Sequence, residues 1–231
     1  MDFRVEPGRR VGVLGGTFDP VHNGHLVLAA AARDGFALDL VVFIPAAQPP
    51  HKQGEPVSSF SHRATMLELA LADQSAMVVS RMERQRLGPS YSIDTLRELR
   101  QNLPAACDLF FIIGSDAFAE ITTWKNYQEL FRYADFLVAE RPDLAPGRLA
   151  HLLGDLPGFT PPAVESSPGL AVDPDLRPWR HRLGGLVYPC SVNAVPVSAT
   201  NIRARARRGQ SLADLVPAPV AAYIEQNGLY R

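Results

Sequence analysis

Two histidines, His22 and His25, follow the glycine pair Gly15 and Gly16 at the point where an apolar run gives way to a polar segment. If a helix begins here, residues i and i+3 project from one side of its first turn, so both imidazoles could contact one anion. An imidazole offers an N–H donor in either protonation state, and the sequence does not decide which state it holds. Gly15, Gly16 and Gly24 let a ligand approach the backbone. We interpret the segment as a phosphate-binding site.

A helix that begins near His25 would also place free backbone N–H groups and a positive dipole end beside the anion. Two alternatives stay open. One is a capped helix whose histidines both face solvent. The other is a zinc site, which is weaker because no cysteine or carboxylate stands at a usual ligand spacing.

A second anion site is predicted in the segment VSATNIRARARRG. Ser198 or Thr200 can cap a helix whose first turns present Arg203, and the start of a helix favours a bound anion. We interpret the arginines that follow as a solvated face. RNA binding by these arginines is the alternative, which the near-neutral charge and the lack of interleaved aromatic residues make weaker.

The elements that must position these residues follow from hydrophobic patterning. Six short apolar runs are typical of buried strands, and segments with helical periodicity separate most of them. This alternation predicts an α/β fold, a doubly wound parallel sheet with helices on both faces. The expected strands are 10–16, 38–46, 76–80, 107–114, 135–140 and 185–192, and the expected helices are 25–34, 61–73, 92–102, 127–133, 200–208 and 219–227.

In such a sheet the histidine segment lies at the carboxyl edge of the first strand, where ligands bind. Neither G-x-G-x-x-G nor G-x-x-x-x-G-K-[ST] occurs in the chain. We expect one domain over residues 1–231, with an irregular Pro-rich insertion at about 142–178 and a small C-terminal helical portion at about 198–231. His151 and His181 are predicted to be surface residues rather than metal ligands.

Composition excludes several classes of protein. The chain has 231 residues, 46% of them hydrophobic, and a formal charge of -1, which gives no overall attraction to nucleic acid or to an anionic membrane. Cys107 and Cys190 lie in apolar runs and are expected to be buried free thiols. No apolar run reaches the roughly 18 residues of a membrane span, and the start lacks a signal-peptide pattern. We therefore expect a cytoplasmic protein, and the sequence leaves a homo-oligomer open.

The string GGTFDPVHNGH resembles the (T/H)xGH signature of the nucleotidyltransferase superfamily, whose Rossmann-like enzymes split ATP or CTP between the α- and β-phosphates. More narrowly, it is similar to the bacterial nicotinate mononucleotide adenylyltransferases. VSATNIR resembles the superfamily's ISSTxIR motif, with Val197 and Ala199 as the two departures. The resemblance implies adenylyl transfer from ATP to nicotinate mononucleotide in NAD biosynthesis, with Mg²⁺ bound through the ATP phosphates and no protein metal ligand.

The resemblance also implies roles for individual residues. His22, His25 and Arg203 would be catalytic. Ser92, in a segment similar to the family's PSYTxDTL, and Trp124 would bind the acceptor; an N-cap serine and an ordinary buried tryptophan are the respective alternatives. The residues implied to bind the nucleotide are Gly15, Gly16, Thr17, Gly24, Lys52, Gly114, Asp116, Ser198 and Thr200. For Lys52 a merely exposed lysine is the alternative.

Other functions on the same scaffold remain as hypotheses. One is an adenylyltransferase for another phosphorylated acceptor, such as nicotinamide mononucleotide or phosphopantetheine. Another is a nucleotide sensor without catalysis, against which the full set of transition-state donors argues. Turnover with ATP separates an enzyme from a sensor.

Overall fold

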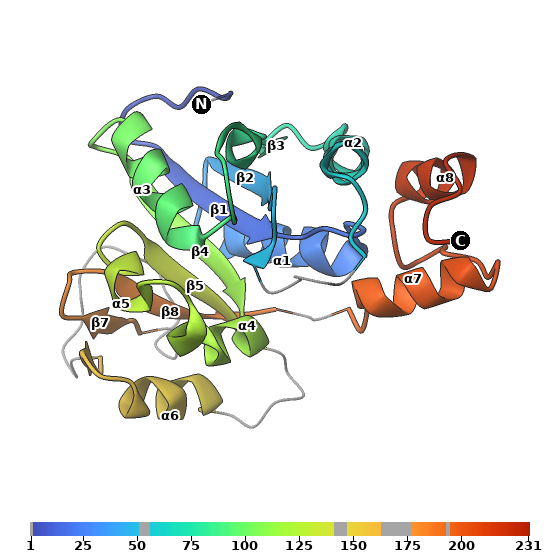
Figure 1. Cartoon of the computed structure of the whole chain (residues 1–231). Coiled ribbons are helices and arrows are strands. Elements are labelled where there is room, and N and C mark those ends of the chain that lie inside the picture. Colours follow the sequence, from blue (N-terminus) through green and yellow to red (C-terminus); the bar gives the residue numbers. More distant parts are fainter. Residues whose placement is uncertain (1, 51–55, 141–146, 163–176, 193–194) are drawn as a thin grey trace.

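The computed structural model of the protein describes residues 2–50, 56–140, 147–162, 177–192 and 195–231 (Figure 1). Within these ranges the strands are β1 Arg10–Gly16, β2 Leu40–Pro45, β3 Met77–Val79, β4 Asp108–Gly114, β5 Asp135–Glu140, β6 Phe159–Thr160, β7 Trp179–His181 and β8 Leu186–Ser191. The helices are α1 Asn23–Gly35, α2 Phe60–Leu71, α3 Ser92–Asn102, α4 Ser115–Ala119, α5 Tyr127–Leu130, α6 Arg148–Asp155, α7 Ala199–Arg207 and α8 Ala218–Gln226, with the short 3-10 helices η2 Met82–Gln85 and η3 Ile121–Thr123.

The described strands form one sheet in the order β3-β2-β1-β4-β5-β8-β7-β6. The first six strands of this order, β3-β2-β1-β4-β5-β8, pair in parallel, which confirms the predicted doubly wound α/β fold. Strands β6 and β7 extend the sheet in the antiparallel direction, and the sequence analysis did not expect them. They are antiparallel because β7 returns directly into β8 through a tight turn, where the Gly184 N–H bonds to the His181 carbonyl at 2.8 Å.

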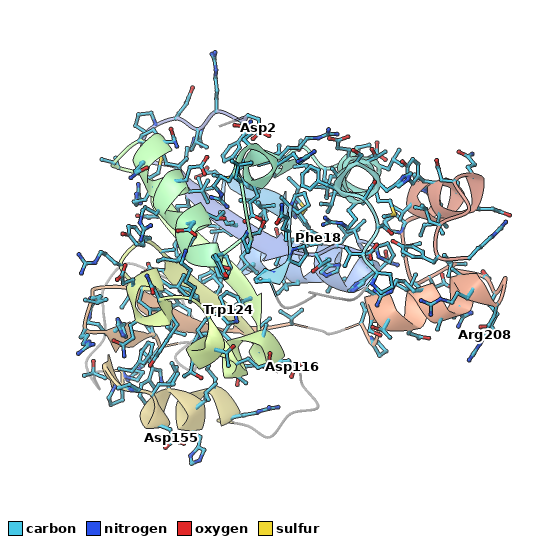
Figure 2. All side chains as sticks on the ribbon, in the orientation of Figure 1. Asp2, Phe18, Asp116, Trp124, Asp155 and Arg208 are labelled. Atoms are coloured by element: carbon cyan, nitrogen blue, oxygen red, sulfur yellow. The ribbon has the colours of Figure 1, made fainter. Side chains whose placement is uncertain are left out.

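Alternate residues of the central strands face two separate cores, as expected for a sheet covered on both sides. In β1, Leu14 joins the core beneath α1, α2, α7 and α8, whereas Val11 and Val13 join the core beneath α3, α4, α5 and α6. Figure 2 shows the contrast with the periphery, where Asp155 and Arg208 lie at the outer ends of α6 and α7 while Phe18 lies inside the molecule.

The prediction that His181 is a surface residue was wrong. Its side chain is 1% exposed, and its ring lies 4.7 Å from the centroids of both Phe131 and Phe159. The cause is strand β7, which turns every second side chain toward the core. His151, on α6, is exposed as predicted. Helix α6 lies within the range of the expected irregular insertion, at Arg148–Asp155.

The two cysteines are free and buried, as predicted. Burial raises the pKa of Cys190 to about 11, so this thiol is unreactive at neutral pH. Among the described residues, no helix is both long enough and apolar enough to cross a membrane.

Candidate active site

The sheet reverses its direction of winding between β1 and β4, and a cavity of about 580 Å³ opens at the carboxyl ends of these strands. Gly15 and Gly16 end β1, and Gly114 ends β4. All three glycines line the cavity, which we call the central cavity. The position is the one that the sequence predicted for the histidine segment.

The histidines begin helix α1 at this edge. His22 is the N-cap residue and His25 lies in the first turn, and their rings stack with centroids 3.7 Å apart and planes 20° apart. The His22 backbone N–H donates to Nδ1 of His25 at 3.2 Å. Because Nδ1 of His25 accepts this bond, a neutral His25 carries its proton on Nε2.

The surroundings of both rings favour the neutral imidazole, a choice that the sequence left open. Burial lowers the pKa of His22 to about 4. Burial and the nearby His22 ring hold the pKa of His25 well below its ordinary value. Both imidazoles are therefore neutral at pH 7, and each offers one N–H donor without a net charge.

The start of α1 offers fewer backbone donors than expected. The Asn23 N–H donates to the Leu215 carbonyl and the His25 N–H to the His22 carbonyl, both at 2.9 Å. The Asn23 side chain also donates to the Asp214 carbonyl at 2.9 Å. Asn23 thus ties the histidine segment to the connection between α7 and α8, a role the sequence analysis missed because its partners are backbone carbonyls.

Helix α7 brings the second predicted anion site to the same place. Ser198 is its N-cap, and its hydroxyl accepts from the Asn201 N–H at 3.2 Å, which leaves the hydroxyl proton free to donate. Arg203 donates to the Asp19 carbonyl at 2.8 Å and lies 3.4 Å from the Thr200 hydroxyl. Ser198 lines the central cavity.

A smaller cavity of about 250 Å³ connects the two motifs. Thr200 and Arg203 line it, together with both histidines and Thr17. Thr17 and the histidines also line the central cavity, so the two cavities adjoin. The structure thus brings the paired imidazoles and the arginine, which are far apart in sequence, to one site.

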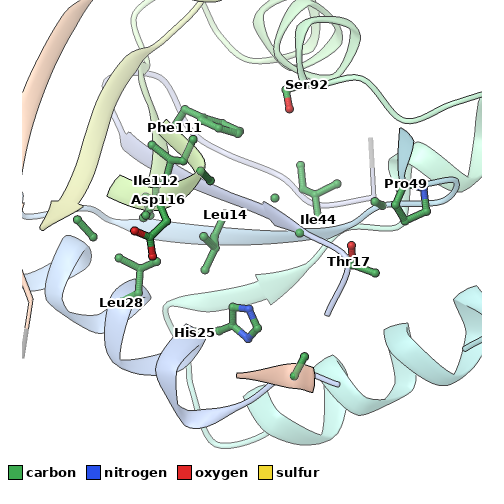
Figure 3. Close-up of a pocket in the computed structure, with 18 of the residues that line it drawn as sticks. Leu14, Thr17, His25, Leu28, Ile44, Pro49, Ser92, Phe111, Ile112 and Asp116 are labelled. Carbon is green, nitrogen blue, oxygen red and sulfur yellow. The ribbon is translucent and has the colours of Figure 1, made fainter. Parts of the chain in front are cut away.

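The predicted acceptor residues, Ser92 and Trp124, also reach this site, where Ser92 begins α3 and Trp124 follows η3. Both line the central cavity, as does Asp116, which was predicted to bind the nucleotide. Figure 3 shows Ser92 across this cavity from His25. Trp124 packs edge-on against Phe111, with centroids 6.2 Å apart. Ser92 is not the N-cap of α3, because that position is Tyr91, so the capping alternative for Ser92 was wrong.

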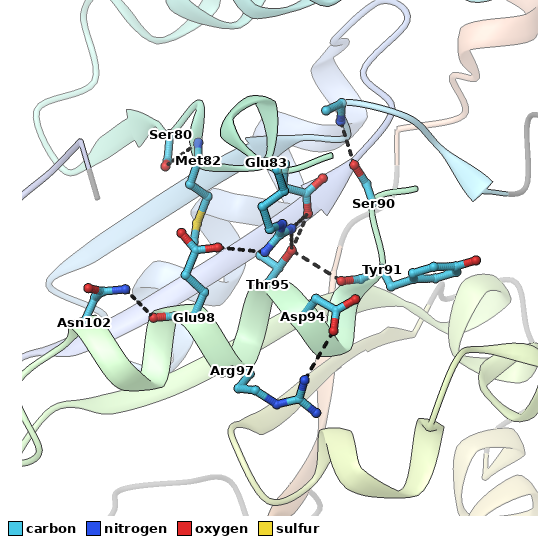
Figure 4. Close-up of polar contacts among 12 residues, drawn as sticks. Ser80, Met82, Glu83, Ser90, Tyr91, Asp94, Thr95, Arg97, Glu98 and Asn102 are labelled. Carbon is cyan, nitrogen blue, oxygen red and sulfur yellow. Dashed lines mark hydrogen bonds and ion pairs between the residues drawn. The ribbon is translucent and has the colours of Figure 1, made fainter. Parts of the chain in front are cut away.

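Polar contacts fix the segment that carries Ser92 (Figure 4). The Ser90 hydroxyl accepts from the Ala47 N–H at 2.9 Å and so holds the loop after β2. In α3, the buried Thr95 hydroxyl donates to Glu83, whose carboxylate lies 3.3 Å from Arg86. These contacts attach the first turn of α3 to η2 and to β2.

Lys125 joins the two segments on the acceptor side. Its ammonium lies 3.1 Å from the Asp94 carboxylate and 4.5 Å from the centroid of the Tyr91 ring. It also lines the central cavity beside Trp124. A positive charge therefore lies at the side of the cavity that Ser92 and Trp124 line.

Arg63 makes contacts to the histidine segment that the sequence analysis did not assign to it. Its side chain is 1% exposed, and it donates to the carbonyls of Thr17 at 2.7 Å and Ser58 at 2.9 Å. A sequence signal existed, because Arg63 precedes Leu67 by one helical turn on the apolar face of α2. Through its bond to the Thr17 carbonyl, Arg63 holds the loop between β1 and α1 against α2.

Gly24 is constrained by packing as well as by the cavity that it lines. A Cβ atom there would lie 3.0 Å from Val197 Cγ1 and 3.1 Å from His22 Nδ1. The glycine therefore lets the start of α1 approach the segment before α7. Lys52, which the resemblance implied for phosphate binding, lies outside the described residues.

Comparison with known proteins agrees with this geometry. Residues 13–205 match the cytidylyltransferase-like family. The chain is 42% identical over 221 residues to a protein from Geobacter metallireducens named probable nicotinate-nucleotide adenylyltransferase, covering 96% of this chain and 98% of that one. A protein of the same name from Desulfitobacterium hafniense is 40% identical over 226 residues, which is 97% of each chain. The chain belongs to the cytidylyltransferase-like family and, within it, to the nicotinate-nucleotide adenylyltransferases.

Solved structures support the fold. The Plasmodium falciparum nicotinic acid mononucleotide adenylyltransferase complexed with NaAD has a TM-score of 0.68 and 16% identity, covering 96% of this chain and 97% of that chain. A structure of the same protein complexed with APC has a TM-score of 0.66 at the same identity and coverage. The likeness extends over nearly the whole of both chains.

Proposed function

We propose that this protein transfers the adenylyl group of ATP to nicotinate mononucleotide, giving nicotinate adenine dinucleotide and pyrophosphate in NAD biosynthesis. One observation carries the proposal: His22, His25 and the first turn of α7 line the same pair of adjoining cavities as Trp124 and Ser92. Hydrogen-bond donors for phosphate and an aromatic site for the acceptor substrate thus meet at the switch point of the sheet. The names of the relatives support the choice of acceptor.

The reaction needs positioning more than proton transfer. An oxygen of the acceptor phosphate forms a bond to the α-phosphorus of ATP, and the bond from that phosphorus to the oxygen shared with the β-phosphate breaks. The electron pair of the broken bond leaves with pyrophosphate. Since the second pKa of a phosphate monoester is about 6, the attacking oxygen is already ionised at neutral pH and needs no general base. The site must align two anions and compensate charge on the leaving group.

Neutral histidines suit this task. The N–H groups of His22 and His25 donate to oxygens at the α-phosphate, where charge builds up during transfer. Arg203 and Thr200 hold the β- and γ-phosphates in the smaller cavity, and Ser198 at the start of α7 adds a hydroxyl from the side of the central cavity. Because both imidazoles are neutral before the reaction, neither must lose a proton to work.

The acceptor side supplies a stacking surface and polar groups. Trp124 stacks on the pyridine ring, and such aromatic stacking is typically worth about 1–3 kcal/mol. The Ser92 hydroxyl donates to the nicotinate carboxylate. Lys125, held by Asp94 and by the Tyr91 ring, adds positive charge on this side.

Magnesium fits the site as a partner of ATP rather than as a resident ion. Among the described residues, no three or more His, Cys, Asp or Glu side chains gather in a way that could hold a metal ion. Beside apolar groups, N–H donors and hydroxyls line the cavities, together with the carboxylates of Asp116 and Glu83 in the central cavity and of Asp19 in the smaller one. Glu83 and Asp19 already accept hydrogen bonds from Thr95 and Tyr230. We propose that Mg²⁺ is held by the ATP phosphates and water, where it would neutralise phosphate charge.

A pyrophosphate-release assay with ATP and a panel of acceptors tests the function. The panel contains nicotinate mononucleotide, nicotinamide mononucleotide and phosphopantetheine, and mass spectrometry identifies the product. We expect the highest kcat/KM with nicotinate mononucleotide and a product that combines both nucleotides. Faster turnover of another acceptor would show that the acceptor is wrong, and binding of ATP without any turnover would leave a sensor.

A further inference from the structure

Asp19 is a junction between the histidine segment and the C-terminal residues. Its carboxylate accepts from the Tyr230 hydroxyl at 2.7 Å and from the Ser58 N–H at 3.2 Å. Its backbone carbonyl accepts from Arg203 at 2.8 Å. Asp19 is 4% exposed, so these contacts are shielded from water. One residue of the β1–α1 loop therefore contacts both α7 and the segment after α8.

Tyr230 is held in a conformation suited to this contact. Its backbone lies in the left-handed region, with φ of 67°, which a residue other than glycine adopts at a cost in free energy. A carboxylate only accepts hydrogen bonds, so the phenol must donate. Burial and the bond to Asp19 raise the pKa of Tyr230, which keeps the donor protonated.

We propose that Tyr230 is a positioning residue for adenylyl transfer: its hydroxyl fixes Asp19, and the Asp19 carbonyl in turn fixes Arg203 beside the paired histidines. The proposal rests on the proposed function, in which Arg203 holds the phosphates of ATP. Tyr230 itself lines neither of the two cavities. It acts through two hydrogen bonds in series, both shorter than 3 Å.

The connection predicts an effect on one substrate only. Asp19 and Arg203 line the smaller cavity, whereas the acceptor residues Ser92 and Trp124 line the central cavity alone. Loosening Asp19 should therefore disturb the phosphate side and leave the acceptor side intact. We expect Tyr230→Phe to lower kcat/KM for ATP about tenfold, which corresponds to about 1.4 kcal/mol. The KM for nicotinate mononucleotide should stay within about twofold of the wild-type value.

Tyr223 provides a matched control. It lies on α8, and its hydroxyl is 2.9 Å from Nδ1 of His62 on α2. Tyr223→Phe removes one hydroxyl of the same kind from the C-terminal portion without touching Asp19. If the two phenylalanine variants lose the same activity, Tyr230 only stabilises the fold and the proposal is wrong.

A double-mutant cycle identifies the route through Arg203. In an Arg203→Ala background, Tyr230→Phe should change kcat/KM for ATP by less than about twofold, because its partner in the site is already gone. Losses that multiply in the double variant would contradict the proposed series of bonds. A loss confined to the KM of the acceptor would contradict it as well. If Tyr230→Phe does not fold, Asp19→Ala removes the acceptor of the same hydrogen bond and tests the same connection, with the same expected split between the substrates.

Binding of a non-hydrolysable ATP analogue separates this proposal from the proposed function. Calorimetry on the wild type, Tyr230→Phe and Tyr223→Phe needs no acceptor and no turnover. An affinity about tenfold weaker for Tyr230→Phe alone supports the positioning role even if nicotinate mononucleotide proves not to be the acceptor. Equal affinities in all three proteins would overturn the role even if the enzyme turns over as proposed.

Discussion

Replacing His25 by asparagine separates the two hydrogen bonds that its ring can make. Nδ1 of His25 accepts the His22 backbone N–H at 3.2 Å, and an asparagine side chain can place an oxygen near this position. The asparagine is too short to supply the Nε2–H donor. His25→Asn therefore preserves the start of α1 while it removes the N–H group assigned to the α-phosphate.

The expected magnitude follows from burial and protonation. The pKa of His25 lies well below its ordinary value, so at neutral pH the lost group is an uncharged donor that binds an anionic oxygen. Hydrogen bonds to charged groups contribute about 1.5–3 kcal/mol, and a preorganised donor at developing charge commonly accounts for about 10²–10³ in turnover. We expect kcat of His25→Asn to fall about 100-fold, with a smaller change in KM for ATP.

The assay is pyrophosphate release at saturating substrates, with thermal unfolding measured on the same samples. His25→Gln is the matched variant, because its longer side chain carries an N–H donor closer to the position of Nε2, and it should retain more turnover than His25→Asn. The ring also packs edge-on against Phe18 at 4.9 Å, so both variants should unfold somewhat more readily. Full turnover in a folded His25→Asn protein would refute the role of His25 in transfer.

Three further predictions concern the same site. Burial lowers the pKa of His22 from 6.5 to about 4, so protonation of this ring favours the unfolded chain. The stability that the neutral ring provides is fully present above about pH 6.5, and as the pH falls toward 4 the free energy of unfolding should drop by about 3 kcal/mol. Urea denaturation should find this drop reduced in His22→Gln. Gly24→Ala should lower kcat about tenfold by pressing on the His22 ring, whereas Gly35→Ala, where a Cβ meets no atom within 4 Å, should leave kcat unchanged. Trp124→Ala should raise KM for nicotinate mononucleotide at least about fivefold and KM for ATP much less, and steady-state kinetics that show the reverse would reject the stacking assignment.

The central sheet could be predicted because each of its strands is an apolar run bounded by polar or turn residues, and these runs match β1, β2, β3, β4, β5 and β8. Strands β6 and β7 gave no such signal, since they have two and three residues and include polar side chains. Helix α4 has five residues, too few to show a helical period. His181 was misplaced for the same reason, because the burial of one residue in a three-residue strand depends on pairing that the sequence does not display.

The site divides in the same way. Motifs predicted which side chains would gather, and the structure places all of them that it describes, which leaves out Lys52, around two adjoining cavities. The residues that hold these side chains in position were not predicted. Asn23 and Arg63 donate to backbone carbonyls, and every residue carries a carbonyl, so the partner leaves no mark in the sequence. The bond of the predicted residue Arg203 to the Asp19 carbonyl was not predicted, for the same reason.

The stacked histidines show why the positive charge of the phosphate side must come from elsewhere. Two imidazole rings whose centroids lie 3.7 Å apart cannot both be positively charged without strong repulsion. Burial already disfavours the charged form of His22. Under the proposed function the imidazoles would therefore act as fixed dipoles, and their N–H groups would need no exchange of protons with solvent during transfer. Arg203 brings a permanent charge from α7, but it can serve the triphosphate only if its position relative to the rings is fixed. Asp19 makes that connection, because its carbonyl holds the guanidinium and it precedes the first histidine by three residues.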